Sequence, residues 1–131
     1  MRPLLAFFVG LSLLGLVACK QPDPTPVLRQ RFELLAKNIC NNQPEACVDL
    51  VDPVYVRAQG TDKVVGSFKL MVGLYKFWNV QENKVRIDEV LVLPTGQTAE
   101  VRYSLQVNGE WKPQKEPTNW RLVDGQWFLQ L

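Results

Sequence analysis

The sequence has no histidine among its 131 residues, which removes several kinds of site. Nucleophile systems that pair serine or cysteine with a histidine base need that side chain, as do histidine-ligated metals. Glycine occurs only at isolated positions, so no glycine-rich phosphate loop is present. We therefore expect neither a metal nor another cofactor.

An excess of charge of one sign is also lacking. The chain carries 15 basic and 13 acidic residues, and its formal net charge is +2. The lysines are scattered and form no stripe. This balance gives no reason to expect a nucleic-acid partner or another polyanion. The composition, 47% hydrophobic and 21% charged, instead predicts one ordinary globular domain.

Long apolar runs are confined to the N-terminus. Residues 4–18 carry no charge and follow Arg2, which supplies one positive charge. This run suits the core of a signal peptide and is shorter than the roughly 20 residues of a membrane-spanning helix. It ends in Leu16-Val17-Ala18-Cys19, which resembles the lipobox of bacterial lipoproteins: an aliphatic residue, a tolerant position, a small residue and a cysteine.

The lipobox resemblance implies that residues 1–18 are a signal peptide and that Cys19 becomes a lipidated N-terminus. The alternatives are a secretory signal with a chance cysteine, or an uncleaved anchor. Residues 19–26 would then form a tether, in which alternating prolines favour an extended chain. In enterobacterial lipoproteins, lack of aspartate after the cysteine favours the outer membrane, and Lys20 stands there. We expect a lipid-anchored protein of the cell membrane, in the outer membrane and facing the periplasm if the cell has two membranes.

Two cysteines remain if Cys19 carries lipid. Cys40 and Cys47 flank the segment Asn41–Pro44, which is rich in turn-forming residues. In an oxidising compartment this spacing predicts a disulfide, which would contribute roughly 2–3 kcal/mol. Two unpaired buried thiols are the alternative, and a metal site is much less favoured.

The first half of the mature chain has helical periodicity. Thr25 and Pro26 suit the cap and the first position of a helix whose apolar residues recur at helical spacing. A short helix is predicted over residues 44–51, ending before Asp52-Pro53. A third is predicted from residue 60, with one apolar face: Val64, Phe68, Met71, Tyr75 and Trp78.

From Lys84 onward the periodicity changes to two, which indicates strands. A bulge is predicted near Asp88-Glu89, because Glu89 interrupts the apolar alternation. Asn108-Gly109 and Asp124-Gly125 are hairpin-turn signals. In the last hairpin, Leu122 should face Trp127 and Trp120 should face Leu129. Helices followed by an antiparallel sheet with one apolar face predict an α+β fold.

This order of elements resembles the NTF2-like (cystatin-like roll) superfamily. The strand Thr98–Val101 and the closing Leu122–Trp127 resemble the "T-A-x-V" and "L-V-x-D-G-x-W" motifs of its small secreted lipoproteins of unknown function. The resemblance covers nearly all of residues 26–131. It implies an NTF2-like domain over residues 27–131, with N-terminal helices packed on a curved antiparallel sheet, and it implies no chemistry.

NTF2-like rolls commonly enclose a cavity between the long helix and the concave sheet. The resemblance makes six residues the candidate lining of a ligand pocket: Phe68, Met71, Tyr75, Tyr103, Trp120 and Trp127. Such a pocket would take a flat or apolar ligand. The alternative is that these aromatic side chains simply fill the core.

Enzymes of the superfamily use a carboxylate base together with a tyrosine hydroxyl. Asp88 or Glu89 would be that base here and Tyr103 the donor, because burial can raise a carboxylate pKa. Nothing in their spacing marks either carboxylate as catalytic. We therefore name no catalytic residue, and an isomerase or dehydratase is the weakest alternative.

Two features suggest an interaction surface. Val90 and Val92 are predicted to lie on the face opposite Leu91 and Leu93 and to form an exposed apolar strip. Through this strip the chain could form a homodimer, and the alternative is that a loop covers it. Trp111 stands among charged residues and proline after a turn, where it would either contact a partner or fold back onto the sheet edge. We expect a non-catalytic binding or interaction module with an envelope protein partner. The alternative is a pocket protein for a small apolar or aromatic ligand.

Overall fold

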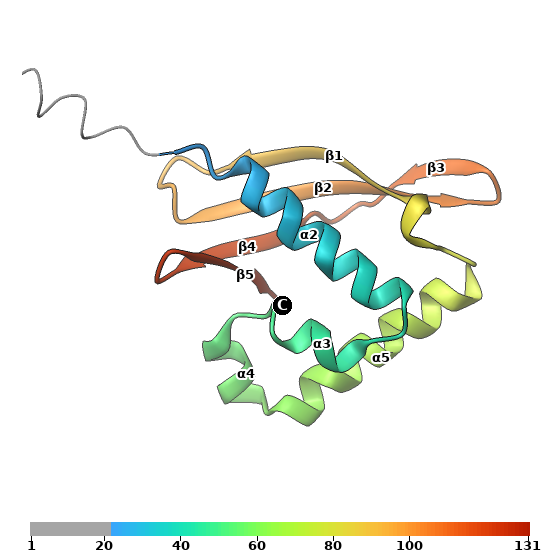
Figure 1. The fold of residues 1–131 in the computed structure, drawn as a ribbon, viewed down its shortest axis with the longest axis horizontal. Coiled ribbons are helices and arrows are strands. Elements are labelled where there is room, and N and C mark those ends of the chain that lie inside the picture. The colour runs from blue at the N-terminus through green and yellow to red at the C-terminus, as the bar shows by residue number, and fades with distance from the viewer. Residues whose placement is uncertain (1–21) are drawn as a thin grey trace, which may run out of the picture.

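The computed structural model describes residues 22–131, so the predicted signal peptide and Cys19 lie outside the described residues. Within these residues, four α-helices come first and five strands follow (Figure 1). The helices are α2 (Thr25–Cys40), α3 (Pro44–Val48), α4 (Pro53–Gln59) and α5 (Thr61–Phe77), followed by the 3-10 turn η1 (Glu82–Lys84). The strands are β1 (Val85–Val92), β2 (Thr98–Val107), β3 (Glu110–Pro113), β4 (Thr118–Val123) and β5 (Gln126–Gln130). Over residues 22–131, no helix has both the length and the apolarity to cross a bilayer.

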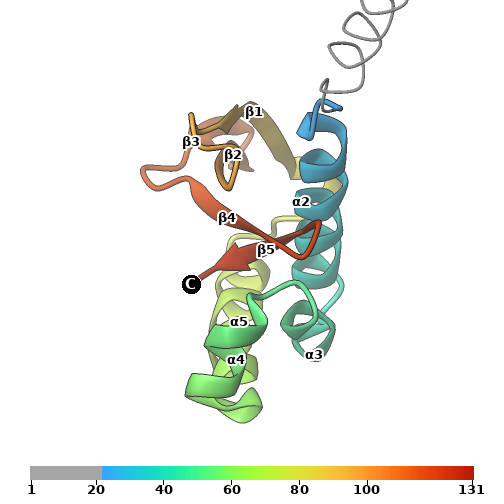
Figure 2. The same cartoon turned by 90° about the vertical axis from the view of Figure 1, so that its left-hand side faces the viewer.

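The strands form one antiparallel sheet in the order β1-β2-β4-β5, with β3 paired to β2. The sheet curves beside α2 and α5 (Figure 2), which confirms the predicted α+β arrangement. Both predicted hairpin turns are present, and each has two residues at positive φ: Asn108-Gly109 and Asp124-Gly125. The last hairpin has the predicted register, with Leu122 opposite Trp127 and Trp120 opposite Leu129.

The predicted bulge is present in β1, where the pairing register with β2 shifts between Ile87 and Glu89. Its consequence was predicted wrongly. An extra residue reverses the inward and outward alternation of the strand beyond it. Val90 and Val92 therefore pack against the core, while Leu91 is 45% exposed. The predicted apolar strip of Val90 and Val92 does not exist.

Aspartate side chains hold the first turns of two helices. Thr25 was predicted to cap α2, but it is the first helical residue, and Pro24 occupies the cap position. The Thr25 N–H donates to Asp23 Oδ1 (3.0 Å). The segment 44–51 is a helix only to Val48, and α4 is an additional helix. Asp52 caps α4, because its Oδ1 accepts from the Val54 N–H (3.0 Å).

Asp52 also connects this helical region to the sheet. Its Oδ2 accepts from Arg121 Nε of β4 (2.7 Å), and this hydrogen bond is the main reason that the Asp52 pKa lies below its ordinary value. The backbone adds two bonds to β5: the Asp52 N–H donates to Leu129 O (2.9 Å), and the Leu129 N–H donates to Leu50 O (2.7 Å). The chain between α3 and α4 is thereby fixed along β5.

The two described cysteines are free thiols, which differs from the predicted disulfide. Cys47 is fully buried in the core, and its Sγ contacts the Gln43 carbonyl of its own helical turn (3.5 Å) instead of another sulfur. Burial raises the pKa of each thiol to about 11, helped by Glu82 near Cys40 and by Glu45 near Cys47. Both groups are therefore protonated and poorly nucleophilic at neutral pH.

Candidate binding sites

A cavity of about 160 Å³ lies between α2, α5 and the sheet, and we call it the central cavity. Four of the six predicted pocket residues line it: Phe68, Met71, Tyr75 and Tyr103. The remaining walls come from α2, from the start of β4 and from the end of β5. Their residues are Phe32, Leu35, Ala36, Ile39, Pro117, Thr118, Asn119, Leu129, Gln130 and Leu131.

The two predicted tryptophans do not line the central cavity. Trp120 is completely buried and Trp127 is 4% exposed, so both rings fill the core. The Trp120 indole Nε1–H donates to Thr118 Oγ1 (2.9 Å), which satisfies its polar group internally. For these two residues the filled-core alternative is correct.

The ionisable side chains of the central cavity are those of two tyrosines. Burial raises the pKa of both Tyr75 and Tyr103, and a hydrogen bond between the two side chains limits the rise at Tyr103. Both hydroxyls therefore stay neutral at physiological pH. An apolar cavity near 150 Å³ has the size that admits a benzene-sized molecule. The central cavity thus suits a small, uncharged, largely apolar ligand.

The carboxylates considered as a base lie elsewhere. Neither Asp88 nor Glu89 lines the central cavity, and both are exposed. Asp88 accepts from Ser104 Oγ (2.5 Å) and from Arg86 Nε (3.0 Å). These bonds, that of Ser104 foremost, lower the Asp88 pKa, whereas a desolvated base would need a raised one. The structure therefore does not bring either carboxylate into the central cavity with Tyr103.

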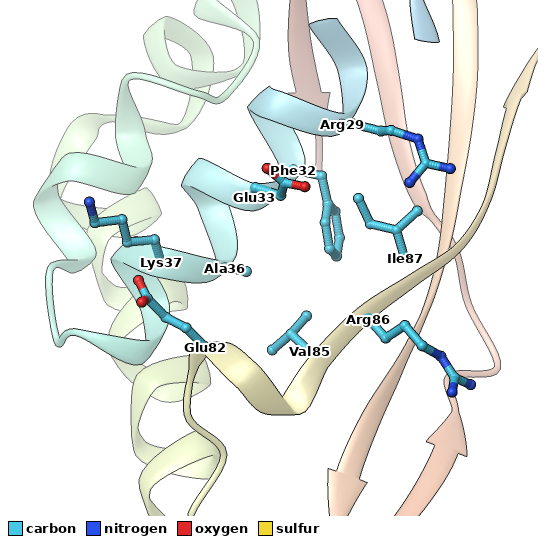
Figure 3. A pocket seen from close by; sticks show the side chains of 9 residues that line it. All are labelled: Arg29, Phe32, Glu33, Ala36, Lys37, Glu82, Val85, Arg86 and Ile87. Carbon is cyan, nitrogen blue, oxygen red and sulfur yellow. The ribbon is translucent and has the colours of Figure 1, made fainter. Parts of the chain in front are cut away.

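A larger opening, which the sequence did not indicate, lies between α2 and β1 (Figure 3). We call it the α2–β1 groove, and its volume is about 570 Å³. Its lining residues come from α2, η1 and β1: Arg29, Phe32, Glu33, Ala36, Lys37, Glu82, Val85, Arg86 and Ile87.

The α2–β1 groove has an apolar floor and a charged rim. Phe32, Val85 and Ile87 point into it, and Phe32 also lines the central cavity (Figure 3). The Phe32 ring packs on Tyr103, with ring centroids 5.2 Å apart, so it separates the two spaces. Because Arg29, Glu33 and Lys37 follow one another at four-residue spacing, α2 presents alternating charges along the rim.

Trp111 lies on the sheet and is 36% exposed. The Arg86 guanidinium stands 4.6 Å from the centroid of its ring, in a cation–π contact, and also binds Asp88. Trp111 and Asp88 thus hold the Arg86 head group away from the groove, as Figure 3 shows for its side chain. The structure therefore favours the folded-back position of Trp111 over a projecting one.

Comparison with solved structures supports the fold. The chain is similar to a Campylobacter jejuni protein described as "Putative NTF2-like transpeptidase", with a TM-score of 0.61 and 13% sequence identity, over 84% of this chain and 99% of that chain. At this identity the similarity shows the fold alone, and it confirms the predicted NTF2-like α+β architecture. No family model matches the chain, and no curated protein matches it.

Proposed function

We propose that the protein is a lipid-anchored, non-catalytic binding module of the cell envelope, whose α2–β1 groove takes an extended peptide segment of an envelope partner. The observation that carries this proposal is the position of the groove. It lies along β1, which is the strand at one edge of the sheet, and it combines an apolar floor with charges of both signs. Anchoring rests on the lipobox resemblance at Cys19, and a tether of roughly 20 Å would keep the groove near the bilayer.

An edge strand favours peptide binding by strand addition. Among the described residues, β1 pairs only with β2, so its outer edge has backbone donors and acceptors available for another strand. Side chains of an added strand alternate, and every second one would enter the groove over Phe32 and Ile87. Arg29 and Glu33 would meet charges of opposite sign at the rim. The partner segment therefore has alternating apolar residues with acidic and basic residues between them.

Site-specific photo-crosslinking in the producing cell tests this function. A photoreactive amino acid at Glu33, on the groove rim, should capture one envelope protein of constant mass. The same amino acid at Asp49, which is exposed and does not line the groove, should not capture it. Ile87→Arg places a charge on the apolar floor and should reduce the Glu33 crosslink at least about tenfold, equivalent to about 1.4 kcal/mol of binding.

Leu91→Arg is the matched control, because Leu91 is exposed on the same strand and does not line the groove. Its crosslink should equal that of the unchanged chain. Equal capture from Asp49 and Glu33, or equal loss with Leu91→Arg and Ile87→Arg, would contradict the peptide site.

The central cavity supports a second candidate function, the sequestration of a small apolar or aromatic ligand. Its size and its neutral tyrosine-containing lining favour this alternative. If it is correct, benzene at 100 times its dissociation constant should stabilise the fold by about 2.7 kcal/mol, seen as a higher melting temperature. Met71→Trp should fill the cavity and abolish the shift, whereas Met71→Leu should preserve it. An unchanged melting temperature in the original chain would exclude this function.

The absence of catalysis is part of the proposal. Its support is that the lining of the central cavity contains no carboxylate side chain and that its two tyrosines are held neutral. The Campylobacter jejuni protein is described as a transpeptidase, but a similarity at 13% identity is no evidence that this chain catalyses the same reaction.

A further inference from the structure

The outward face of α5 carries large apolar side chains that nothing in the described chain covers. Leu70 is 75% exposed and Phe77 is 83% exposed. Leu74 and Trp78, one turn away, are 49% and 40% exposed. Residues three and four apart on a helix share a face, so these four side chains form one patch. Figure 1 shows no helix or strand on the outer side of this end of α5.

Glycine alternates with the two most exposed of these residues. Gly66, Leu70, Gly73 and Phe77 follow one another at intervals of four, three and four, which is the spacing of a helix–helix seam. A Cβ atom added at Gly66 or at Gly73 would meet no atom within 4 Å. The fold of the single chain therefore does not require glycine at either position, although glycine weakens a helix. Glycine here leaves two hollows beside two projecting side chains.

We propose that this face binds a second copy of the chain, with the two α5 helices antiparallel about a two-fold axis. In one alignment of the two antiparallel helices, Phe77 lies over Gly66 of the second copy. The same alignment places Leu70 over Gly73 of the second copy. Each large side chain then meets a hollow, and the symmetry repeats both contacts. A parallel pair would instead place Phe77 over Phe77 and glycine over glycine. Shape complementarity thus selects the antiparallel arrangement.

The buried area is sufficient for a specific dimer. The exposed parts of Leu70, Leu74, Phe77 and Trp78 amount to roughly 500 Å² in each copy, the size of a functional apolar patch. A pair would bury on the order of 1,000 Å², which is the lower bound for a biological interface. We therefore expect a reversible dimer with a micromolar dissociation constant.

Native mass spectrometry of the full chain released from detergent tests the dimer. The unchanged chain should give a dimer whose proportion rises with concentration. Phe77→Glu should raise the dissociation constant at least about tenfold. Leu91→Glu, which also replaces an exposed apolar residue but lies on β1, should leave it unchanged.

Gly73→Leu separates dimerisation from folding. Leucine fills the hollow but has the better helix propensity, and its Cβ would lie more than 4 Å from every atom outside the adjoining helix backbone. This variant should lose the dimer while its melting temperature, measured where the chain is monomeric, stays equal or rises.

Three results would overturn the proposal. The first is a chain that is monomeric at all concentrations, and the second is a dimer that Leu91→Glu disrupts and Phe77→Glu does not. The third is a monomer whose binding to phosphatidylglycerol vesicles requires Phe77, because this face would then belong to a lipid surface.

Discussion

Replacing Trp120 with alanine should lower the free energy of unfolding by about 3–5 kcal/mol, the range for deleting a large aromatic side chain from a core. Trp120 is completely buried on β4, opposite Leu129 of β5. The lost ring would leave a void and would remove the Nε1–H hydrogen bond to Thr118 Oγ1. Urea unfolding followed by circular dichroism measures the change. Because small domains are stable by only about 5–15 kcal/mol, much of the variant should be unfolded well below the original midpoint.

Trp111 provides the matched control for this substitution. It is the same residue type in the same sheet, but it is 36% exposed and its main contact is the Arg86 guanidinium. Trp111→Ala should therefore cost only about 1 kcal/mol. Similar losses for the two variants would contradict the assignment of Trp120 to the core and of Trp111 to the surface.

Cys19→Ser should move the protein from the membrane fraction to the soluble fraction, or leave its leader uncleaved. A serine hydroxyl cannot carry the thioether-linked lipid, and each acyl CH₂ contributes about 0.8 kcal/mol to membrane binding. Cell fractionation and incorporation of radiolabelled palmitate measure the two effects. Cys40→Ser, which changes a cysteine within the domain, should keep the label and the membrane location. A cleaved Cys19→Ser chain that stays in the membrane fraction would disprove the lipid anchor.

Features that depend on neighbours in the sequence were predicted well. The turn at Asp124-Gly125 needs two residues that accept positive φ, and both residues are adjacent in the chain. The register of Trp120 with Leu129 follows from that turn alone. The position of the β1 bulge was also visible, because Glu89 interrupts an apolar alternation.

The errors lie where one local irregularity or one distant contact decides the result. The bulge was placed correctly, but its reversal of the alternation was not carried through to Val90 and Val92. Asp52 was interpreted as a helix stop, whereas Asp-Pro is also a helix-start signal, with Asp as cap and Pro in the first turn. Its bond to Arg121 spans 69 positions of sequence, which no local pattern reveals.

The two candidate sites also differ in how far the sequence alone could predict them. Phe68 and Tyr75 share one helix face, so their presence in the central cavity could be inferred from spacing and the superfamily resemblance. The α2–β1 groove could not, because its walls come from two elements far apart in the chain. On α2 its rim consists of ordinary charged residues at helical spacing, which usually face solvent.

The backbone bonds between residues 50–52 and Leu129 also limit how large an assembly the sheet can nucleate. Val51 forms a parallel bridge with Leu129, so the β5 side of the sheet is already occupied by the chain itself. Filament growth by strand stacking needs two open sides, one to join the chain before and one to receive the next. In the described part of the chain, the open edges are those of β1 and of the short strand β3, each of which pairs only with β2. A second molecule could not place its strand beside Leu129 without displacing residues 50–52, so the chain itself blocks strand stacking at the β5 end of the sheet.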